Sequence, residues 1–410
     1  MNMFKLIFVV IVLLESIWEM VLLLLNVKYS TSKDAKVPEV LKDKISGEDF
    51  EKSKTYLKDK AKLESVSILV KLFLTLFFIF VGFPYFEKFA ITISNSTIIQ
   101  GLIFFGIYGL ISFLVNLPFK IYSTFVIEEK YGFNTMNGKT FLIDSIKNII
   151  VAIILFTPLI ILLLWILGID QNWWWKVSLG YIVFQIVLTF IYPIFIAPMF
   201  NKFTPLKDEK LKNEISKLLK KADFDVSNIY VMDASRRTKK QNAYLTGFGK
   251  SKRLVLYDTI LNYSTEEILS IVAHELGHSR KKHIPKLLVI ISVVYTFMFY
   301  LINLVYNYIL NNNVFEIKMP YSAFMYSFIF ISSVIFFAMP IINFLQRKFE
   351  FEADNYSAKL LGTPEYMISS LKKLVKENLS NVNPYPLYKI WHYNHPSPEE
   401  RINYLLKMKK

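Results

Sequence analysis

The chain has 410 residues, of which 53% are hydrophobic and 16% aromatic, and its mean hydropathy is +0.37. It is far more apolar than a soluble protein. Its formal charge is +15, but the basic residues are not gathered in one domain with interleaved aromatic residues. This distribution excludes nucleic acid as a partner. With no cysteine, disulfides and thiolate metal ligands are also excluded. The composition predicts an integral, multi-pass membrane protein.

Seven apolar segments are each long enough to cross about 30 Å of hydrocarbon as a helix. In chain order the predicted spans are residues 3–25, 66–88, 98–118, 147–168, 176–199, 286–309 and 321–345. The first could be mistaken for a signal peptide, but Glu15 and Glu19 interrupt it and no small-residue cleavage site follows, so we interpret it as a retained span. A carboxylate near mid-bilayer is costly unless wetted, and we expect Glu15 to face water.

The basic residues predict the orientation of these spans. Of 48 Lys and Arg residues, 43 lie in segments 27–65, 118–147, 200–286 and 346–410, which seven spans place on one side. By the positive-inside rule that side is cytoplasmic, so the N-terminus lies outside. The excess charge also suits contact with anionic membrane lipid.

We predict four regions along the chain. Residues 1–200 form a membrane domain of five spans, in which the charged segment 27–65 is expected to form amphipathic helices at the cytoplasmic surface. Residues 201–285 form a catalytic segment, 286–345 a transmembrane hairpin and 346–410 a C-terminal segment.

The catalytic segment has the pattern of a small α+β domain. An amphipathic helix around Leu211–Leu219 precedes three strand-like runs, "NIYVMD", "NAYLTGF" and "KRLVLYD". A second helix is predicted to start at Ser264, because Glu267 follows at the spacing of a capping box. This helix contains the sequence "HELGH".

The "HELGH" sequence predicts a metal site. Positions i and i+4 share one face of a helix, so His274 and His278 can bind one metal ion, while Glu275 can reach a water molecule without being a ligand. Taken alone the pattern also fits a solvated helix face. A third ligand is available after the seventh span, where Glu350 and Asp354 stand at i, i+4 spacing.

The neighbouring residues are given other roles. Glu352 is expected to point away from the metal, and Asp354 to accept a hydrogen bond from the non-ligating nitrogen of a bound histidine. His283 lies about 180° round a continuous helix from His274 and is assigned to structure. Without a metal, Glu350 and Asp354 would be a charged turn after a span.

Seven ordered motifs resemble those of the zinc-dependent CaaX prenyl proteases. They are "FVIEEKYGFN", "IAPMFNKFTPL", "NAYLTGF", "RLVLYDT", "HELGH", "FEFEADNYSAKLLG" and "WHYNHP". The resemblance implies a mainly α, polytopic membrane protein whose seven tilted helices enclose a water-filled chamber, with a small α+β, zincin-like catalytic domain on the cytoplasmic side. One departure is Ser279, where eukaryotic relatives tend to have tryptophan, and this bears on the shape of the nearby pocket.

The resemblance also implies roles for individual residues. It implies one Zn²⁺ per chain with Glu275 as the base, and contacts from His395 and Arg401 to the substrate carbonyl or the developing oxyanion, a role that suits cationic and N–H donors. The implied zinc ligands are His274, His278 and Glu350, with Asp354 behind them. The implied substrate-binding strand offers Asn242, Ala243 and Tyr244 to an extended peptide.

The predicted function is that of a zinc metalloendopeptidase cleaving near the C-terminus of a lipid-anchored, prenylated peptide or protein. The alternatives are a general quality-control metalloprotease for membrane proteins and a non-catalytic, metal-containing scaffold or transporter. Three ligands with a poised acid favour an enzyme, because structural zinc is normally closed by four. We expect a monomer in contact with membrane lipid, in the plasma membrane of a prokaryote or the endoplasmic reticulum of a eukaryote.

Overall fold

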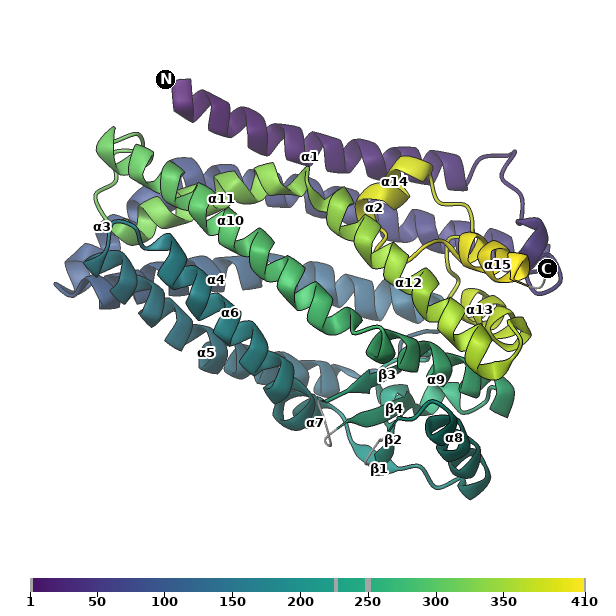
Figure 1. The fold of residues 1–410 in the computed structure, drawn as a ribbon. Helices are drawn as coiled ribbons and strands as arrows, with labels where there is room; N and C mark the ends of the chain where they lie inside the picture. The colour runs from purple at the N-terminus through teal and green to yellow at the C-terminus, as the bar shows by residue number, and fades with distance from the viewer. Residues whose placement is uncertain (1–2, 225–227, 248–251, 409–410) are drawn as a thin grey trace.

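The computed structural model describes residues 3–224, 228–247 and 252–408. Long helices run between the two ends of the molecule, with the N-terminus at one end and the C-terminus and a small sheet at the other (Figure 1). The helices are α1 (Met3–Ser30), α2 (Gly47–Phe77), α3 (Phe83–Ile93), α4 (Thr97–Tyr122), α5 (Gly138–Ile169), α6 (Trp174–Ile191), α7 (Ala197–Phe200), α8 (Glu209–Lys221), α9 (Thr265–Arg280), α10 (His283–Asn311), α11 (Pro320–Phe336), α12 (Met339–Leu361), α13 (Glu365–Glu377), α14 (Pro386–His392) and α15 (Pro398–Lys407).

The seven predicted spans all lie in long apolar helices. Within the described residues, six continuous helical runs are long and apolar enough to cross a membrane, and α11 with α12 makes a seventh that is bent by 55°. The mainly α, multi-pass architecture is therefore confirmed. The six runs are Met3–Ser30, Gly47–Ile93, Thr97–Glu128, Gly138–Ile169, Trp174–Phe200 and His283–Asn311.

The bend in the seventh span was not predicted, and it positions the site. Pro340 stands in the first turn of α12, where its missing N–H and its ring prevent an unbroken continuation of α11. Beyond the bend α12 departs from the direction of α11 (Figure 1). This part of α12 crosses α9 in close contact. Glu350 and Asp354 lie on this redirected part.

The segment 27–65 differs from the expected surface helices. From Gly47 it is the first half of α2, which continues without a break into the second span. Its apolar side chains are covered by protein: Phe50 packs in a cluster with Met367 and Leu371 of α13, and Ala61 packs against Leu23 of α1. The amphipathic pattern therefore reflects helix packing.

The catalytic segment forms a four-stranded sheet with the order β1-β2-β4-β3. Strands β2 and β4 are parallel, and the other pairs are antiparallel. Three strands were predicted, whereas the short β1 was not. Leu254 and Leu256 of β4 share a buried core with Ile215 of α8 and with Val272 and Leu276 of α9, so α9 is held against the sheet beside the edge strand β3. The strands are β1 (Phe203–Pro205), β2 (Asn228–Met232), β3 (Ala243–Thr246) and β4 (Arg253–Tyr257).

Two large cavities lie among the helices, in keeping with the expected chamber. They have volumes of about 800 and 730 Å³, and Lys60 and Glu64 line both. The second cavity extends to His395 and Arg401. In the first span Glu19 lies 3.6 Å from His392 of α14, whereas the wet surroundings of Glu15 stay a prediction.

Candidate metal centre

Helix α9 begins where its capping residues predict. The Ser264 hydroxyl accepts a hydrogen bond from the backbone N–H of Glu267, and the Glu267 carboxylate accepts one from the Ser264 N–H. This reciprocal cap satisfies two N–H groups that a helix start leaves unpaired. It fixes the start of the helix and places His274 and His278 in its third and fourth turns.

A glycine permits the close crossing of α9 and α12. A Cβ atom at Gly277 would lie 2.9 Å from the Ala353 Cα and 3.1 Å from its carbonyl oxygen, so only hydrogen fits there. One turn away the Ser357 hydroxyl donates to the Ser270 carbonyl at 2.8 Å. The two backbones therefore approach closely enough for side chains from both helices to meet.

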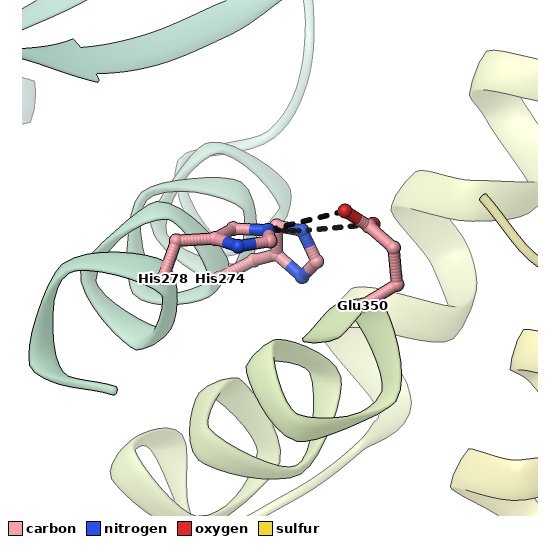
Figure 2. Close-up of side chains that lie close together, drawn as sticks. All are labelled: His274, His278 and Glu350. Atoms are coloured by element: carbon pink, nitrogen blue, oxygen red, sulfur yellow. Dashed lines mark hydrogen bonds and ion pairs between the residues drawn. The ribbon is translucent and has the colours of Figure 1, made fainter. Parts of the chain in front are cut away.

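The side chains that meet at this crossing are the three predicted ligands (Figure 2). The Nε2 atoms of His274 and His278 lie 3.4 and 3.3 Å from the two carboxylate oxygens of Glu350, and 3.1 Å from each other. One potential ligand atom from each residue falls within 4.8 Å of the others. The structure thus brings together residues that are 72 positions apart in sequence, His278 and Glu350.

These three residues fit a metal ion. The buried Oε2 atom of Glu350 has only long contacts within the described residues, to Nε2 of His274 at 3.4 Å and to Nη1 of Arg401 at 3.5 Å, so it retains the capacity to bind a cation. Two imidazole nitrogens and one carboxylate oxygen are a common protein donor set for catalytic zinc, which leaves the fourth position to water or substrate.

Asp354 and Arg401 lie behind His274. The fully buried Asp354 carboxylate lies 2.9 Å from the Nδ1 atom of His274, the nitrogen that faces away from Glu350. Burial alone would lower the pKa of His274, but hydrogen bonds to Asp354 and Glu350 raise it to about 9. Without metal both ring nitrogens therefore carry a proton at neutral pH, and Asp354 would keep the proton on Nδ1 when Nε2 binds a metal.

Arg401 makes different contacts from those expected. Its Nε and Nη2 atoms donate to both oxygens of Asp354 at 2.8 and 2.6 Å, and its Nη1 atom lies 3.5 Å from Glu350. The bidentate pair uses two of the five guanidinium N–H donors, and Arg401 also lines the 730 Å³ cavity, so its contact with a substrate carbonyl stays a prediction. Arg401 is placed to hold the buried carboxylates, and sequence reasoning did not anticipate this.

Glu275 lies between the two histidines and next to the sheet. Burial raises the pKa of its carboxyl, while charge on His274 and His278 and a backbone hydrogen bond from Leu245 of β3 oppose the rise. A carboxyl with a raised pKa is better suited to accept and return a proton near neutral pH.

His395 reaches the site from the loop after α14. Its Nε2 atom lies 3.3 Å from the Glu350 carboxylate, and its side chain is 57% exposed, toward the 730 Å³ cavity. Arg347, one turn before Glu350 on α12, donates to the carbonyl oxygen of Tyr393 at 2.7 Å and so anchors the loop. Sequence reasoning missed Arg347, although its spacing of three from Glu350 marks the same helix face.

Strand β3, the proposed substrate-binding strand, lies at the edge of the sheet, and its successive side chains point to opposite faces. Ala243 is buried in the core shared with α9, whereas the Tyr244 hydroxyl faces the opposite side of the sheet and lies 3.9 Å from the Met232 sulfur. Asn242 is exposed, and its side-chain oxygen accepts a hydrogen bond from the Ala243 N–H. A peptide along this edge would therefore meet main-chain groups and Asn242.

Glu352 lies outside the ligand group of the described residues, but it contacts a histidine next to that group. Its Oε2 atom lies 3.1 Å from the Nε2 atom of His283, whose Nδ1 atom lies 3.0 Å from Nδ1 of His278. The contact of His283 with His278 was not predicted, because the phase assigned to His283 assumed that α9 continues, whereas α9 ends at Arg280 and α10 starts at His283. His283 remains outside the group of three ligand atoms within the described part of the chain.

Comparisons with known proteins agree with this arrangement. Residues 26–202 match the model of the CAAX prenyl protease N-terminal domain with five membrane helices, and residues 205–409 match peptidase family M48. The chain belongs to peptidase family M48. CAAX prenyl protease 1 of Saccharomyces cerevisiae is 36% identical, covering 92% of this chain and 90% of the yeast protein.

Other M48 relatives show the same extent of similarity. The CAAX prenyl protease 1 homolog of Homo sapiens is 33% identical, covering 91% of this chain and 89% of its own length. The crystal structure of S. mikatae Ste24p matches with a TM-score of 0.90 and 34% identity, covering 99% of both chains. Membership of M48, together with the His and Glu cluster, identifies this membrane protein as a metalloendopeptidase.

Proposed function

We propose that the chain is a zinc-dependent endopeptidase that cleaves near the C-terminus of prenylated peptides or proteins. The observation that carries the proposal is the convergence of His274, His278 and Glu350 beside Glu275. This group contacts His395 and Arg401, which line a large cavity among the helices. Relatives that cover about nine tenths of the chain are called CAAX prenyl proteases.

The side chains divide the hydrolysis between them. A bound zinc ion would supply a Lewis acid that polarises the scissile carbonyl and makes water more acidic. Glu275 then takes a proton from the attacking water and delivers it to the leaving amine. His395, exposed at the cavity, donates to the carbonyl oxygen as it gains negative charge. Arg401 acts by holding Asp354 and Glu350 in place.

The peptide lies along the free edge of β3. Such an edge offers main-chain N–H and C=O groups to an extended chain, apart from the Leu245 N–H, which already donates to Glu275. Asn242 is exposed at the start of the strand, next to Gln241, which lines the 730 Å³ cavity. The cavities leave room for an isoprenyl group, whose burial contributes about 0.8 kcal/mol per CH₂.

We place the site on the cytoplasmic side of the membrane. The basic residues of segments 200–286 and 346–410 support this orientation, because the positive-inside rule favours cytoplasmic lysine and arginine. Both segments contribute to one site at the same end of the bundle (Figure 1). The corresponding compartment is the plasma membrane in a prokaryotic host and the endoplasmic reticulum in a eukaryotic one.

Matched peptides with and without a farnesyl group on the cysteine test the substrate proposal. At saturating concentration in the same detergent, the farnesylated peptide should have the higher turnover number, since binding of a remote group can position the scissile bond. Equal turnover of both peptides, or faster cleavage of unrelated unfolded membrane proteins, would instead indicate general quality control.

A further inference from the structure

Two side chains outside the ligand group, His283 and Glu352, continue a hydrogen-bonded chain that starts at His278 and ends in a carboxylate. The Nδ1 atoms of His278 and His283 are 3.0 Å apart, and the Nε2 atom of His283 is 3.1 Å from the Oε2 atom of Glu352. His283 is only 3% exposed and stacks on Phe349 with ring centroids 4.3 Å apart. Its ring is therefore held in one orientation.

A local backbone break makes this contact possible. On a continuous helix, a residue five positions after His278 would lie about 140° round the axis and could not touch it. Instead Lys282 adopts a left-handed conformation with φ of 55°, so that α9 ends and His283 folds back over the His278 ring. A lysine in this region of φ and ψ is uncommon, and the surrounding packing must hold it there.

We propose that His283 and Glu352 are positioning residues that fix the tautomer and ring orientation of His278 for metal binding. The inference rests on the proposed zinc site. The Nε2 atom of His278 faces Glu350 and His274, so it needs a free lone pair, and the proton must be on Nδ1. That N–H donates to Nδ1 of His283, which leaves the His283 proton on Nε2, where it donates to Glu352.

The reverse arrangement is disfavoured by the carboxylate. If His283 donated through Nδ1, its neutral ring would turn an unprotonated Nε2 toward Glu352, placing a lone pair against a negative charge. Helix α12 thus supplies a carboxylate to each ligand histidine. Asp354 contacts His274 directly, and Glu352 contacts His278 through His283. Ligating histidines generally need such a partner at the second ring nitrogen.

Equilibrium zinc affinity of purified, full-length variants tests the proposal. His283→Leu keeps an apolar side chain against Phe349 but removes both hydrogen bonds, so the zinc dissociation constant should rise about 10–100-fold. His283→Gln offers an amide oxygen to His278 and an N–H to Glu352, and should recover most of the lost affinity. Arg280→Gln, exposed in the last turn of α9, is the matched control and should match the wild type.

The melting temperatures of the zinc-free proteins show whether a loss of zinc affinity comes with a loss of fold stability, which separates a positioning role of His283 from a packing role. If His283→Gln and His283→Leu lose equal zinc affinity, or if His283→Leu binds zinc as tightly as the wild type, the proposed relay from His278 through His283 to Glu352 is wrong. The variant His278→Ala separates a test of the relay from a test of the metal site. Strong loss of zinc with His278→Ala but none with His283→Leu rejects only the relay, whereas no loss with His278→Ala rejects the metal site itself.

Discussion

Charged side chains have different surroundings at the crossing of α9 and α12 and in the wall of the two cavities, which together are called the chamber. At the crossing, the fully buried Asp354 receives hydrogen bonds from His274 and Arg401. In the chamber wall, Lys60 and Glu64 line both cavities, and no ion pair within 4.0 Å joins either to another described residue. The first region uses charge to fix geometry, whereas the charged groups of the second border open cavities, where we expect water to solvate them.

The largest expected effect comes from removing a ligand at the crossing. Glu350→Ala leaves two imidazoles, which bind zinc weakly, and also leaves Arg401 with one carboxylate fewer. Zinc affinity should fall by more than the ~100-fold that follows loss of a supporting partner, and hydrolysis should cease. Metal analysis after dialysis measures this, and an unchanged zinc content would place the third ligand elsewhere.

The close backbone contact at the crossing predicts the next effect. Gly277→Ala forces its new Cβ against Ala353, so we expect a loss of about 1–3 kcal/mol in stability together with weaker zinc binding. Gly106→Ala, in α4, is the control, because nothing lies within 4 Å of its Cβ position. Thermal unfolding and zinc titration of both variants check the prediction. Equal behaviour of the two would contradict the tight crossing.

The raised pKa of His274 predicts a pH dependence of metal binding. Without metal this imidazole is protonated below its pKa of about 9, so zinc must displace a proton at neutral pH. Affinity should rise about tenfold per pH unit from pH 7 to 9 and then level off. Chelator competition across this range gives the slope. A flat profile would show that His274 is already neutral at pH 7.

The smallest effect concerns the chamber wall and needs no activity assay. The chain lacks cysteine, so a single introduced thiol is a clean probe. A cysteine at Glu64, which lines both cavities, should react with a water-soluble maleimide in membranes, whereas one at Phe73, 69% exposed on the same helix, should be shielded by lipid. Protection at both positions would argue against a wet chamber.

Local periodicity and capping predicted the spans and the start of α9, and i, i+4 spacing predicted the pairing of His274 and His278. The choice of Glu350 over Asp354 as the third ligand came from the resemblance to a known family. The sequence did not predict the 55° bend at Pro340, and the left-handed Lys282 made the assumed phase of His283 invalid. The partners of Arg401 depend on how a C-terminal helix packs 47 residues beyond Asp354, and no local pattern encodes that contact.

The turnover of Glu275→Gln at full zinc occupancy tests the central claim most directly. The substitution removes the base but keeps the shape of the side chain and all three proposed ligands. With a farnesylated peptide, we expect the bound zinc to equal that of the wild type while the turnover number falls about 10²–10⁴-fold. Wild-type turnover by the zinc-loaded variant would contradict the assignment of Glu275 as the base and the mechanism built on it.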